Sequence, residues 1–170
     1  MRRVPVLRSV TLALLAVTAS AANQPPEIEH QPSPCTVSGK AISFCASITD
    51  DNQVARARVH FKRAGDPYYS YVEMDFQGLN YCTTLPAPRE GKVRQLEYYV
   101  QAIDDQYEPV RTSTYQIVVQ PEGVCEFPPV EKDKARLAAI TVYATNKKQG
   151  KKLPDGFDPT GVTFVPVSAK

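Results

Sequence analysis

The stretch QLEYYVQAIDD, residues 95–105, alternates without a break between inward and outward positions. Its first face carries Leu96, Tyr98, Val100 and Ala102, and its second carries Glu97, Tyr99 and Gln101. A period of two is the mark of an extended strand with one buried face, because a helix would group residues three and four apart. The run therefore predicts a half-buried strand that ends in a turn at its two aspartates.

Six further runs follow the same rule and are separated by Gly, Pro, Asn and Asp, the residues that favour turns. They cover residues 23–34, 41–51, 54–63, 68–76, 81–86 and 110–121. Their expected inward residues are Ile42, Phe44, Ala46, Ile48, Ala57, Val59, Phe61, Val72, Met74, Tyr81, Leu85, Tyr115, Ile117 and Val119. Short strands at this spacing, without a convincing helix, predict an all-β fold: a seven-stranded antiparallel β-sandwich with a short C-terminal β extension.

The first 21 residues have the order of a secretory signal peptide. Arg2, Arg3 and Arg8 form a basic start, the apolar run VTLALLAV follows at 10–17, and Ala19-Ser20-Ala21 offers a small-x-small cleavage site. The apolar run is too short to span a bilayer, and no later stretch is apolar enough. We therefore expect an exported protein, periplasmic or extracellular, without a membrane span.

The net charge of +2 hides a division along the chain. Residues 22–125 carry nine basic and thirteen acidic residues, whereas residues 126–170 carry eight and five. We expect residues 22–125 to form the sandwich and residues 126–170 a basic extension. An acidic module is not a general nucleic-acid binder, so any attraction to anions should reside in the extension.

Several motifs resemble one family. They are GKAISF, ITDDNQV, VHFKRAG, VEM, YCTTLP and LEYYVQAIDD, which lie within residues 39–105. Together they resemble the fibronectin type III-like, immunoglobulin-like modules of exported and cell-surface bacterial proteins, over about residues 26–120. The chain departs from that family in having no tryptophan, so Phe44 would fill the corresponding core layer, and in having four cysteines. The resemblance implies the fold but no single function, because such modules serve as spacers, docking domains or adhesive units.

Four cysteines in an oxidising compartment favour two disulfides, with three connectivities open. In the topology that the resemblance implies, Cys45 and Cys82 lie mid-strand on the outward face of neighbouring strands. Cys35 and Cys125 lie near the same end of the sandwich. We therefore expect Cys45 to pair with Cys82 and Cys35 with Cys125, and the rival pair to be Cys35 with Cys45.

One sheet face is the first candidate for partner binding. Its expected outward side chains include Arg56, Arg58, His60, Tyr71 and Tyr99. Exposed tyrosine with arginine is typical of interface hot spots. The alternative is a solvated ladder in which these cations, together with Lys62 on the same strand, pair with Glu73 and Glu97 on adjacent strands.

The extension contains two strand-like runs, residues 136–145 and 161–167, and Pro166 restricts the second to a sheet edge. Between them lie Lys147, Lys148, Lys151 and Lys152. These lysines either form a solvated loop or contact an anionic surface. Because a lone two-stranded unit is marginally stable, the extension must pack on the sandwich, add to a partner's sheet or stay mobile.

Metal, cofactor and catalytic motifs are poorly represented. The acidic residues Asp50, Asp51, Asp104 and Asp105 would approach one another at one end of the sandwich. Turn caps are the favoured interpretation, and calcium binding is the alternative. We expect no cofactor, no metal and no enzyme activity.

The predicted function is a non-catalytic docking module for another envelope or cell-surface protein. The alternatives are a structural spacer or accessory subunit and a carbohydrate- or calcium-binding module. The oligomeric state stays open.

Cleavage after Ala21 can be checked directly. N-terminal sequencing of the protein isolated from cell envelopes or culture medium should begin at Ala22, because the small residues before it fit signal peptidase. An intact Met1 in that fraction would refute export by this segment.

Overall fold

A computed structural model of the protein describes residues 23–125 and 139–168. Twelve strands form in these residues, together with one short 3-10 helix, η1 (Lys147–Gln149), and no α-helix. The strands are β1 (Glu27–Glu29), β2 (Cys35–Val37), β3 (Ile42–Thr49), β4 (Val54–Arg63), β5 (Ser70–Glu73), β6 (Asp75–Phe76), β7 (Tyr81–Leu85), β8 (Gln95–Asp104), β9 (Pro109–Arg111), β10 (Tyr115–Gln120), β11 (Ile140–Ala144) and β12 (Val162–Val165). No helix within the described ranges is long and apolar enough to cross a membrane.

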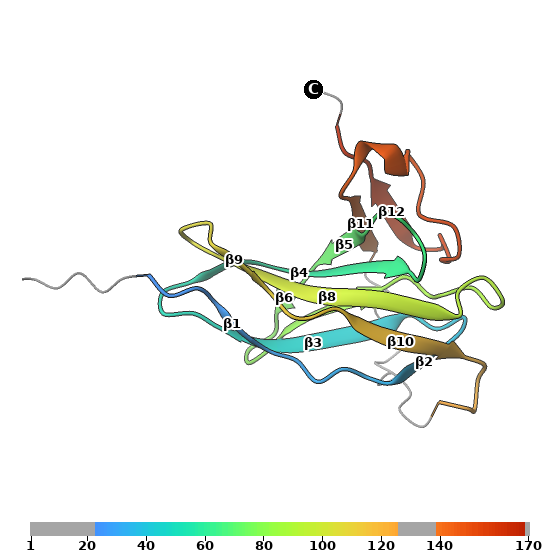
Figure 1. The fold of residues 1–170 in the computed structure, drawn as a ribbon, viewed down its shortest axis with the longest axis horizontal. Helices are drawn as coiled ribbons and strands as arrows, with labels where there is room; N and C mark the ends of the chain where they lie inside the picture. Colours follow the sequence, from blue (N-terminus) through green and yellow to red (C-terminus); the bar gives the residue numbers. More distant parts are fainter. Residues whose placement is uncertain (1–22, 126–138, 169–170) are drawn as a thin grey trace, which may run out of the picture.

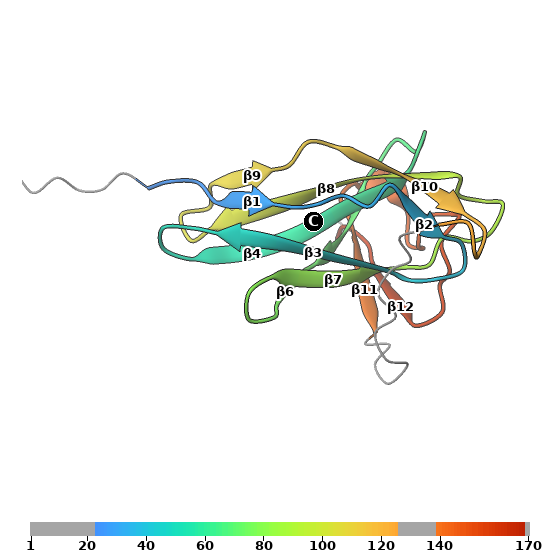
Figure 2. The ribbon, with the colours of Figure 1, turned by 90° about the horizontal axis from the view of Figure 1, so that it is seen from below.

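The strands make two sheets that pack face to face (Figures 1 and 2). The smaller sheet has the order β1-β3-β7-β6, and the larger has the order β12-β11-β5-β4-β8-β10-β2, with β9 also paired to β8. Without β11 and β12, the strands divide between the two sheets as in an immunoglobulin-like sandwich. β1, β3, β7 and β6 take the places of strands A, B, E and D, and β4, β8 and β10 those of C, F and G, with β5 beside β4. The expectation of an all-β sandwich is therefore confirmed.

The expected count of seven strands is not confirmed, since the described residues form twelve. Two expected strands are each divided in two, β2 lies just beyond the expected first strand, and the extension adds two more. After β1 the chain passes Pro32 and Pro34 and then joins the other sheet as β2. The fourth breaks at Met74, where the chain crosses from the larger sheet to the smaller. The seventh breaks around Thr112. The fold is also not purely antiparallel, because β2 with β10 and β11 with β12 are parallel pairs.

Strand β8 has the alternation that its sequence predicts. Its buried side includes Leu96, Tyr98, Val100 and Ala102, all fully buried. Tyr98 meets Phe44 of the opposite sheet, with ring centroids 4.7 Å apart, so Phe44 does fill the layer between the sheets. The Tyr98 hydroxyl lies 2.7 Å from Nε2 of His30, in the segment that follows β1. A buried phenol therefore keeps a hydrogen-bond partner.

Two disulfides hold the sandwich, and both are the expected pairs. Cys45 and Cys82 lie directly opposite each other on β3 and β7, with their Cα atoms 4.2 Å apart. Cys35 and Cys125 have Cα atoms 5.8 Å apart and a sequence separation of 90 residues. The second bridge ties the beginning of the module to its end and closes a long loop, which restricts the unfolded chain strongly.

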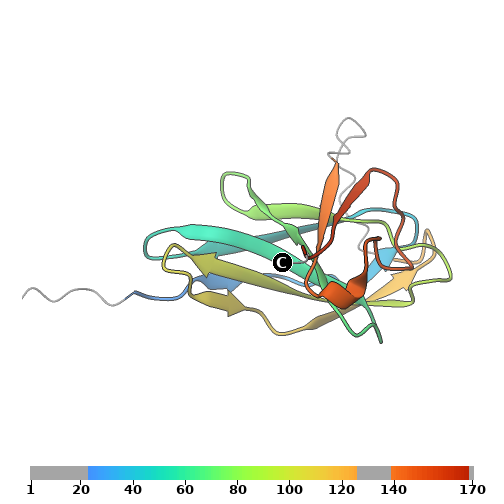
Figure 3. The ribbon, with the colours of Figure 1, turned by 90° about the horizontal axis from the view of Figure 1, so that it is seen from above.

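The C-terminal strands pack on the protein's own sandwich (Figure 3). β11 pairs antiparallel with β5, through Tyr143 opposite Tyr71 and Ala144 opposite Ser70. β12 then pairs with β11 and becomes the edge of the sheet, the position to which Pro166 restricts it. Of the alternatives open from the sequence, packing on the sandwich is the one the structure shows.

The connection between β11 and β12 closes one end of the core. Phe157, 2% exposed, meets the buried Phe61 ring at 5.2 Å. Backbone hydrogen bonds from Arg89 to Gly156 (2.7 Å) and from Asp158 to Ala87 (2.8 Å) hold the segment in place. Gly156 has φ +102, and a Cβ there would lie 2.8 Å from Val93 Cγ2, so only glycine permits this approach without displacement.

Because Phe157 belongs to the same core as β4, Phe157→Ala should destabilise the whole sandwich by about 3–5 kcal/mol. Urea unfolding followed by circular dichroism measures this change. Leu79→Ala is the control, since Leu79 is 85% exposed and its truncation should change stability by no more than about 0.5 kcal/mol. An unchanged midpoint for Phe157→Ala would mean that the C-terminal segment is not part of the core.

Candidate functional site

Four aromatic rings form a row across the outer face of the larger sheet. Tyr143 on β11 lies opposite Tyr71 on β5, Tyr71 opposite His60 on β4, and His60 opposite Tyr99 on β8. All four face away from the core, because their neighbours Val142, Val72, Val59 and Val100 point inward. Direct cross-strand pairing thus places residues from four segments of the chain side by side. We call this set the ring row.

The rings of the row lie against one another. Tyr71 and Tyr143 have centroids 4.9 Å apart and an interplanar angle of 13°, and His60 and Tyr99 are 4.6 Å apart at 8°. His60 and Tyr71 are 5.3 Å apart at 33°. Offset stacking of this kind adds to the energy of area burial and holds each side chain in one orientation. Each ring of the row thus packs against its neighbour within the protein itself.

Charged side chains border the ring row on both sides. On one side, Arg58 pairs with Glu73 at 2.9 Å and its guanidinium lies 4.5 Å from the Tyr71 centroid. On the other side, Lys62 pairs with Glu97 at 3.0 Å and lies 4.9 Å from the ring centroid of Tyr69, which precedes β5. These cross-strand ion pairs are the ones the sequence suggested, and each contributes a few tenths of a kcal/mol.

His60 differs from its expected role. The sequence predicted a side chain facing water, but His60 is only 7% exposed. It does point to the outer face, where the Tyr71 and Tyr99 rings cover it. Alternation along a strand predicts the face and not the exposure, since exposure depends on side chains of neighbouring strands.

Burial lowers the pKa of His60 to about 4, and the nearby Arg58 and Arg111 act in the same direction. Its Nε2 lies 3.0 Å from Oε1 of Gln101, which makes Nε2–H the donor. Nδ1 is buried and has no hydrogen-bond partner among the described residues. His60 is therefore neutral at pH 7 and serves as a flat ring within the row.

The structure gathers five predicted partner-binding residues on this face: Arg56, Arg58, His60, Tyr71 and Tyr99. The sequence missed Tyr143, Arg111 and Tyr69. The alternation of residues 140–144 shows that Tyr143 lies on the opposite face of its strand from Val142. It does not show that Tyr143 would lie beside Tyr71. Arg111, on β9, lies over Tyr99 at 5.0 Å.

The four extension lysines lie elsewhere. Lys147 and Lys148 are in η1, and Lys151 and Lys152 follow it. All four are exposed, and none takes part in the ion pairs found among the described residues. Gln149 anchors η1 to the beginning of β5 by donating to Ser70 Oγ at 3.0 Å. The lysine loop therefore has a fixed base, and its role as a partner-binding site stays a prediction.

Of the acidic residues at the end of the sandwich, Asp50 and Asp104 cap their own turns, whereas Asp51 and Asp105 bond to other segments. Asp104 is fully buried and accepts hydrogen bonds from the backbone of Gln106 (3.0 Å) and Glu108 (2.6 Å) and from Asn23 Nδ2 (2.7 Å). Asp50, Asp51 and Asp105 accept from Asn52 N, Gln24 N and Asn52 Nδ2 respectively. Within the described ranges, no three His, Cys, Asp or Glu side chains gather in a way that would hold a metal ion.

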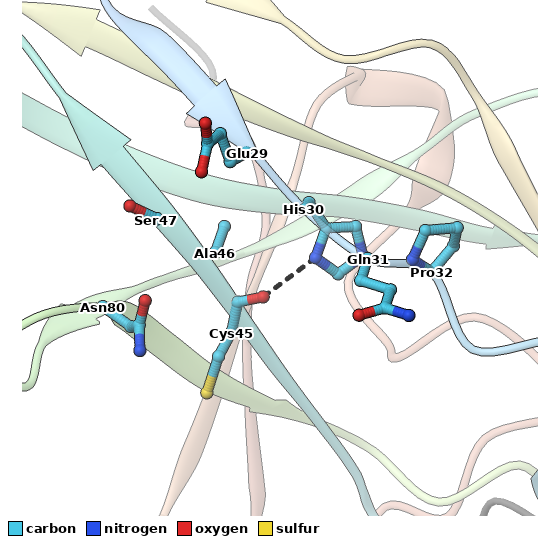
Figure 4. A pocket seen from close by; sticks show the side chains of 8 residues that line it. All are labelled: Glu29, His30, Gln31, Pro32, Cys45, Ala46, Ser47 and Asn80. Carbon is cyan, nitrogen blue, oxygen red and sulfur yellow. Dashed lines mark hydrogen bonds between the residues drawn. The ribbon is translucent and has the colours of Figure 1, made fainter.

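A shallow groove lies on the smaller sheet where the first strand leaves β3 (Figure 4). Its lining residues are Glu29, His30, Gln31, Pro32, Cys45, Ala46, Ser47 and Asn80. His30 Nδ1 lies 2.8 Å from the Cys45 carbonyl, so it donates, and Nε2 accepts from Tyr98. Both nitrogens of this imidazole are thus used to fasten the chain, which leaves neither to act on a ligand.

Comparison with known proteins assigns no family to the chain. No protein-family model matches the chain, and no curated protein does. Among solved structures, an engineered protein is 12% identical with a TM-score of 0.44, over 62% of this chain and 22% of that chain. The SrpA adhesin from Streptococcus sanguinis is 19% identical with a TM-score of 0.42, over 60% of each chain.

A chimeric titin Z1Z2 carrying an exogenous KLER peptide from decorin is 20% identical, with a TM-score of 0.38, over 60% of this chain and 100% of that chain. The matched part of the protein thus spans less than two thirds of the engineered protein and of the adhesin. At these scores the immunoglobulin-like assignment rests on the protein's own strand order, and function must be argued from its surface.

The buried imidazoles predict acid sensitivity. Burial lowers the pKa of both His30 and His60 below 6.5, to about 4 for His60. The unfolded chain therefore binds protons at a higher pH than the folded protein, and stability should fall as the pH decreases from 6.5 towards 4. For His60 the loss is on the order of 3 kcal/mol.

The chain has only two histidines, so their NMR signals can be followed separately during a pH titration. His60→Asn identifies its signal and should remove part of the acid destabilisation seen in urea unfolding. A measured pKa of 6.5 or above for His60 would contradict the buried, neutral ring described here.

Proposed function

We propose that this protein is a non-catalytic docking module of the cell envelope or cell exterior, and that it binds another protein through the outer face of its larger sheet. The observation that carries the proposal is the ring row with its bordering arginines. Tyrosine and arginine are enriched at the energetic centres of protein interfaces. Here they are brought together from β4, β5, β8, β9 and β11.

The stacking of the row favours binding for an entropic reason. A free tyrosine or arginine loses rotamer freedom when a partner immobilises it, at a cost of about 0.5–1.5 kcal/mol per side chain. In this protein Tyr71, Tyr99 and Arg58 are already held by their neighbours. A partner would meet a surface that is ordered beforehand, so more of the contact energy would appear as affinity.

The same geometry favours a protein over a carbohydrate. Sugar rings bind to the open faces of aromatic side chains, but adjacent rings and guanidinium groups lie against the faces of Tyr71, His60 and Tyr99. What the row leaves available is ring edges bordered by charged side chains, which suits the polar and apolar mixture of a protein surface.

Export and the absence of catalysis are further parts of the proposal. The two disulfides support an oxidising compartment, where such bonds persist. The two histidines bond to Gln101, Tyr98 and the Cys45 carbonyl, which are structural partners. Membership among the fibronectin type III-like modules of exported bacterial proteins stays a prediction from the sequence motifs.

Site-specific crosslinking tests the docking face. A photoreactive phenylalanine analogue replaces Tyr99 in one variant and Thr84, on the outer face of the smaller sheet opposite Ser43, in the other. Both are expressed in the native host and irradiated in intact cells. The Tyr99 variant should yield one defined crosslinked protein, and the Thr84 variant should not.

Equal crosslinking from both positions, or none from Tyr99, would contradict docking by this face. The second result would favour the alternative in which the sandwich acts only as a spacer. Urea unfolding of each variant confirms that the fold is intact before the comparison is made.

A further inference from the structure

We infer that the partner presents carboxylate side chains to one corner of this face, formed by Arg56, Arg58 and Arg111. This inference rests on the proposed docking function and adds the chemistry of the partner to it. The corner is defined by strand register, by the distribution of ion pairs and by the aromatic rings that hold the arginines.

Strand register brings the three arginines together. Arg58 on β4 lies opposite Gln101 on β8, and Gln101 lies opposite Arg111 on β9. The two arginines are thus two strand spacings apart, about 10 Å. Arg56 precedes Arg58 by two residues and therefore points to the same face. Gln101, a neutral side chain, lies between the two rows of positive charge.

The charge at this corner is only partly offset. Glu73 pairs with Arg58 through Nε at 2.9 Å. The other ion pairs of the described residues involve Lys40, Lys62, Arg63 and Arg89, and so neither Arg56 nor Arg111. Three guanidinium groups with one carboxylate leave an excess of positive charge, which a second carboxylate from a partner would complement.

Two of the arginines are held in position by tyrosines of the ring row. Arg58 lies 4.5 Å from the Tyr71 centroid and Arg111 lies 5.0 Å from the Tyr99 centroid. Both arginines are also close to His60, which lies between these rings. Burial lowers the pKa of His60 most, and the two arginines lower it further. Arg58 uses its Nε for Glu73, and Arg111 also hydrogen-bonds to Tyr99. A guanidinium has five N–H donors, so each of the two still has donors for a carboxylate.

The distribution of charge over the module favours an acidic protein segment over a polyanion. Residues 22–125 carry more acidic than basic residues, so much of the surface would repel a long sulfated polysaccharide or a nucleic acid. A partner with a few carboxylates needs only the local positive corner. The four lysines of the η1 loop are the competing basic site, and they lie on a different segment.

The test uses mature protein, residues 22–170, and a fluorescent hexaglutamate peptide at low salt. Arg56→Gln with Arg111→Gln removes two charges from the corner, and Lys147→Gln with Lys148→Gln removes two from the η1 loop. The arginine pair should weaken hexaglutamate binding by about tenfold or more, and the lysine pair by less than about twofold. Binding of the unaltered protein should also perturb the NMR signal of His60, which faces Arg58, Arg111, Tyr71, Tyr99 and Gln101.

Three results would overturn the inference: no binding of hexaglutamate, a loss confined to the lysine pair, or tighter binding of heparin than of hexaglutamate with the same dependence on Arg56 and Arg111. The crosslink at Tyr99 in intact cells distinguishes failure of the carboxylate contact from failure of the docking function. If the arginine pair leaves that crosslink unchanged, docking stands and the carboxylate contact falls. If the unaltered protein gives no Tyr99 crosslink, the docking function itself fails.

Discussion

The register between β4 and β8 determines both faces of the larger sheet. Phe61 opposite Tyr98 and Val59 opposite Val100 belong to the core, while His60 opposite Tyr99 belongs to the outer face. A slip of one residue would exchange the two sets and place charged and polar side chains inside. The interior packing of Phe61 and Tyr98 therefore fixes the position of the ring row, even though none of the row contributes to the core.

The C-terminal strands depend on this arrangement and also complete it. In their absence β5 would be the edge of the larger sheet, with unpaired backbone groups that invite association. β11 covers that edge and adds Tyr143 to the row, and the segment that follows inserts Phe157 beside Phe61. One stretch of chain thus contributes to the core on one side of the sheet and to the candidate interface on the other. This explains why the row cannot be treated as a property of the sandwich alone.

The sequence was informative where a short-range rule applied. Alternation identified the inward faces of β3, β4 and β8, and strand phase with the implied topology identified both disulfides. It failed where position depends on a distant segment. Nothing near Tyr71 indicates that Tyr143 would pair with it, and nothing near His60 indicates that two rings would bury it. Likewise, prolines mark where β1 ends, but the sequence analysis did not predict β2, which pairs with β10 in the other sheet.

His60 shows how stability and recognition are related on this face. Burial opposes protonation of this imidazole, and the nearby Arg58 and Arg111 oppose it further. A neutral ring can stack between Tyr71 and Tyr99 without adding a third positive charge to an already cationic corner. A lysine or arginine at this position would be repelled by both Arg58 and Arg111, and an aliphatic residue would remove the stacking between the rings. Histidine in its neutral form meets both requirements, and its lower pKa follows first from burial between the rings and then from the nearby arginines.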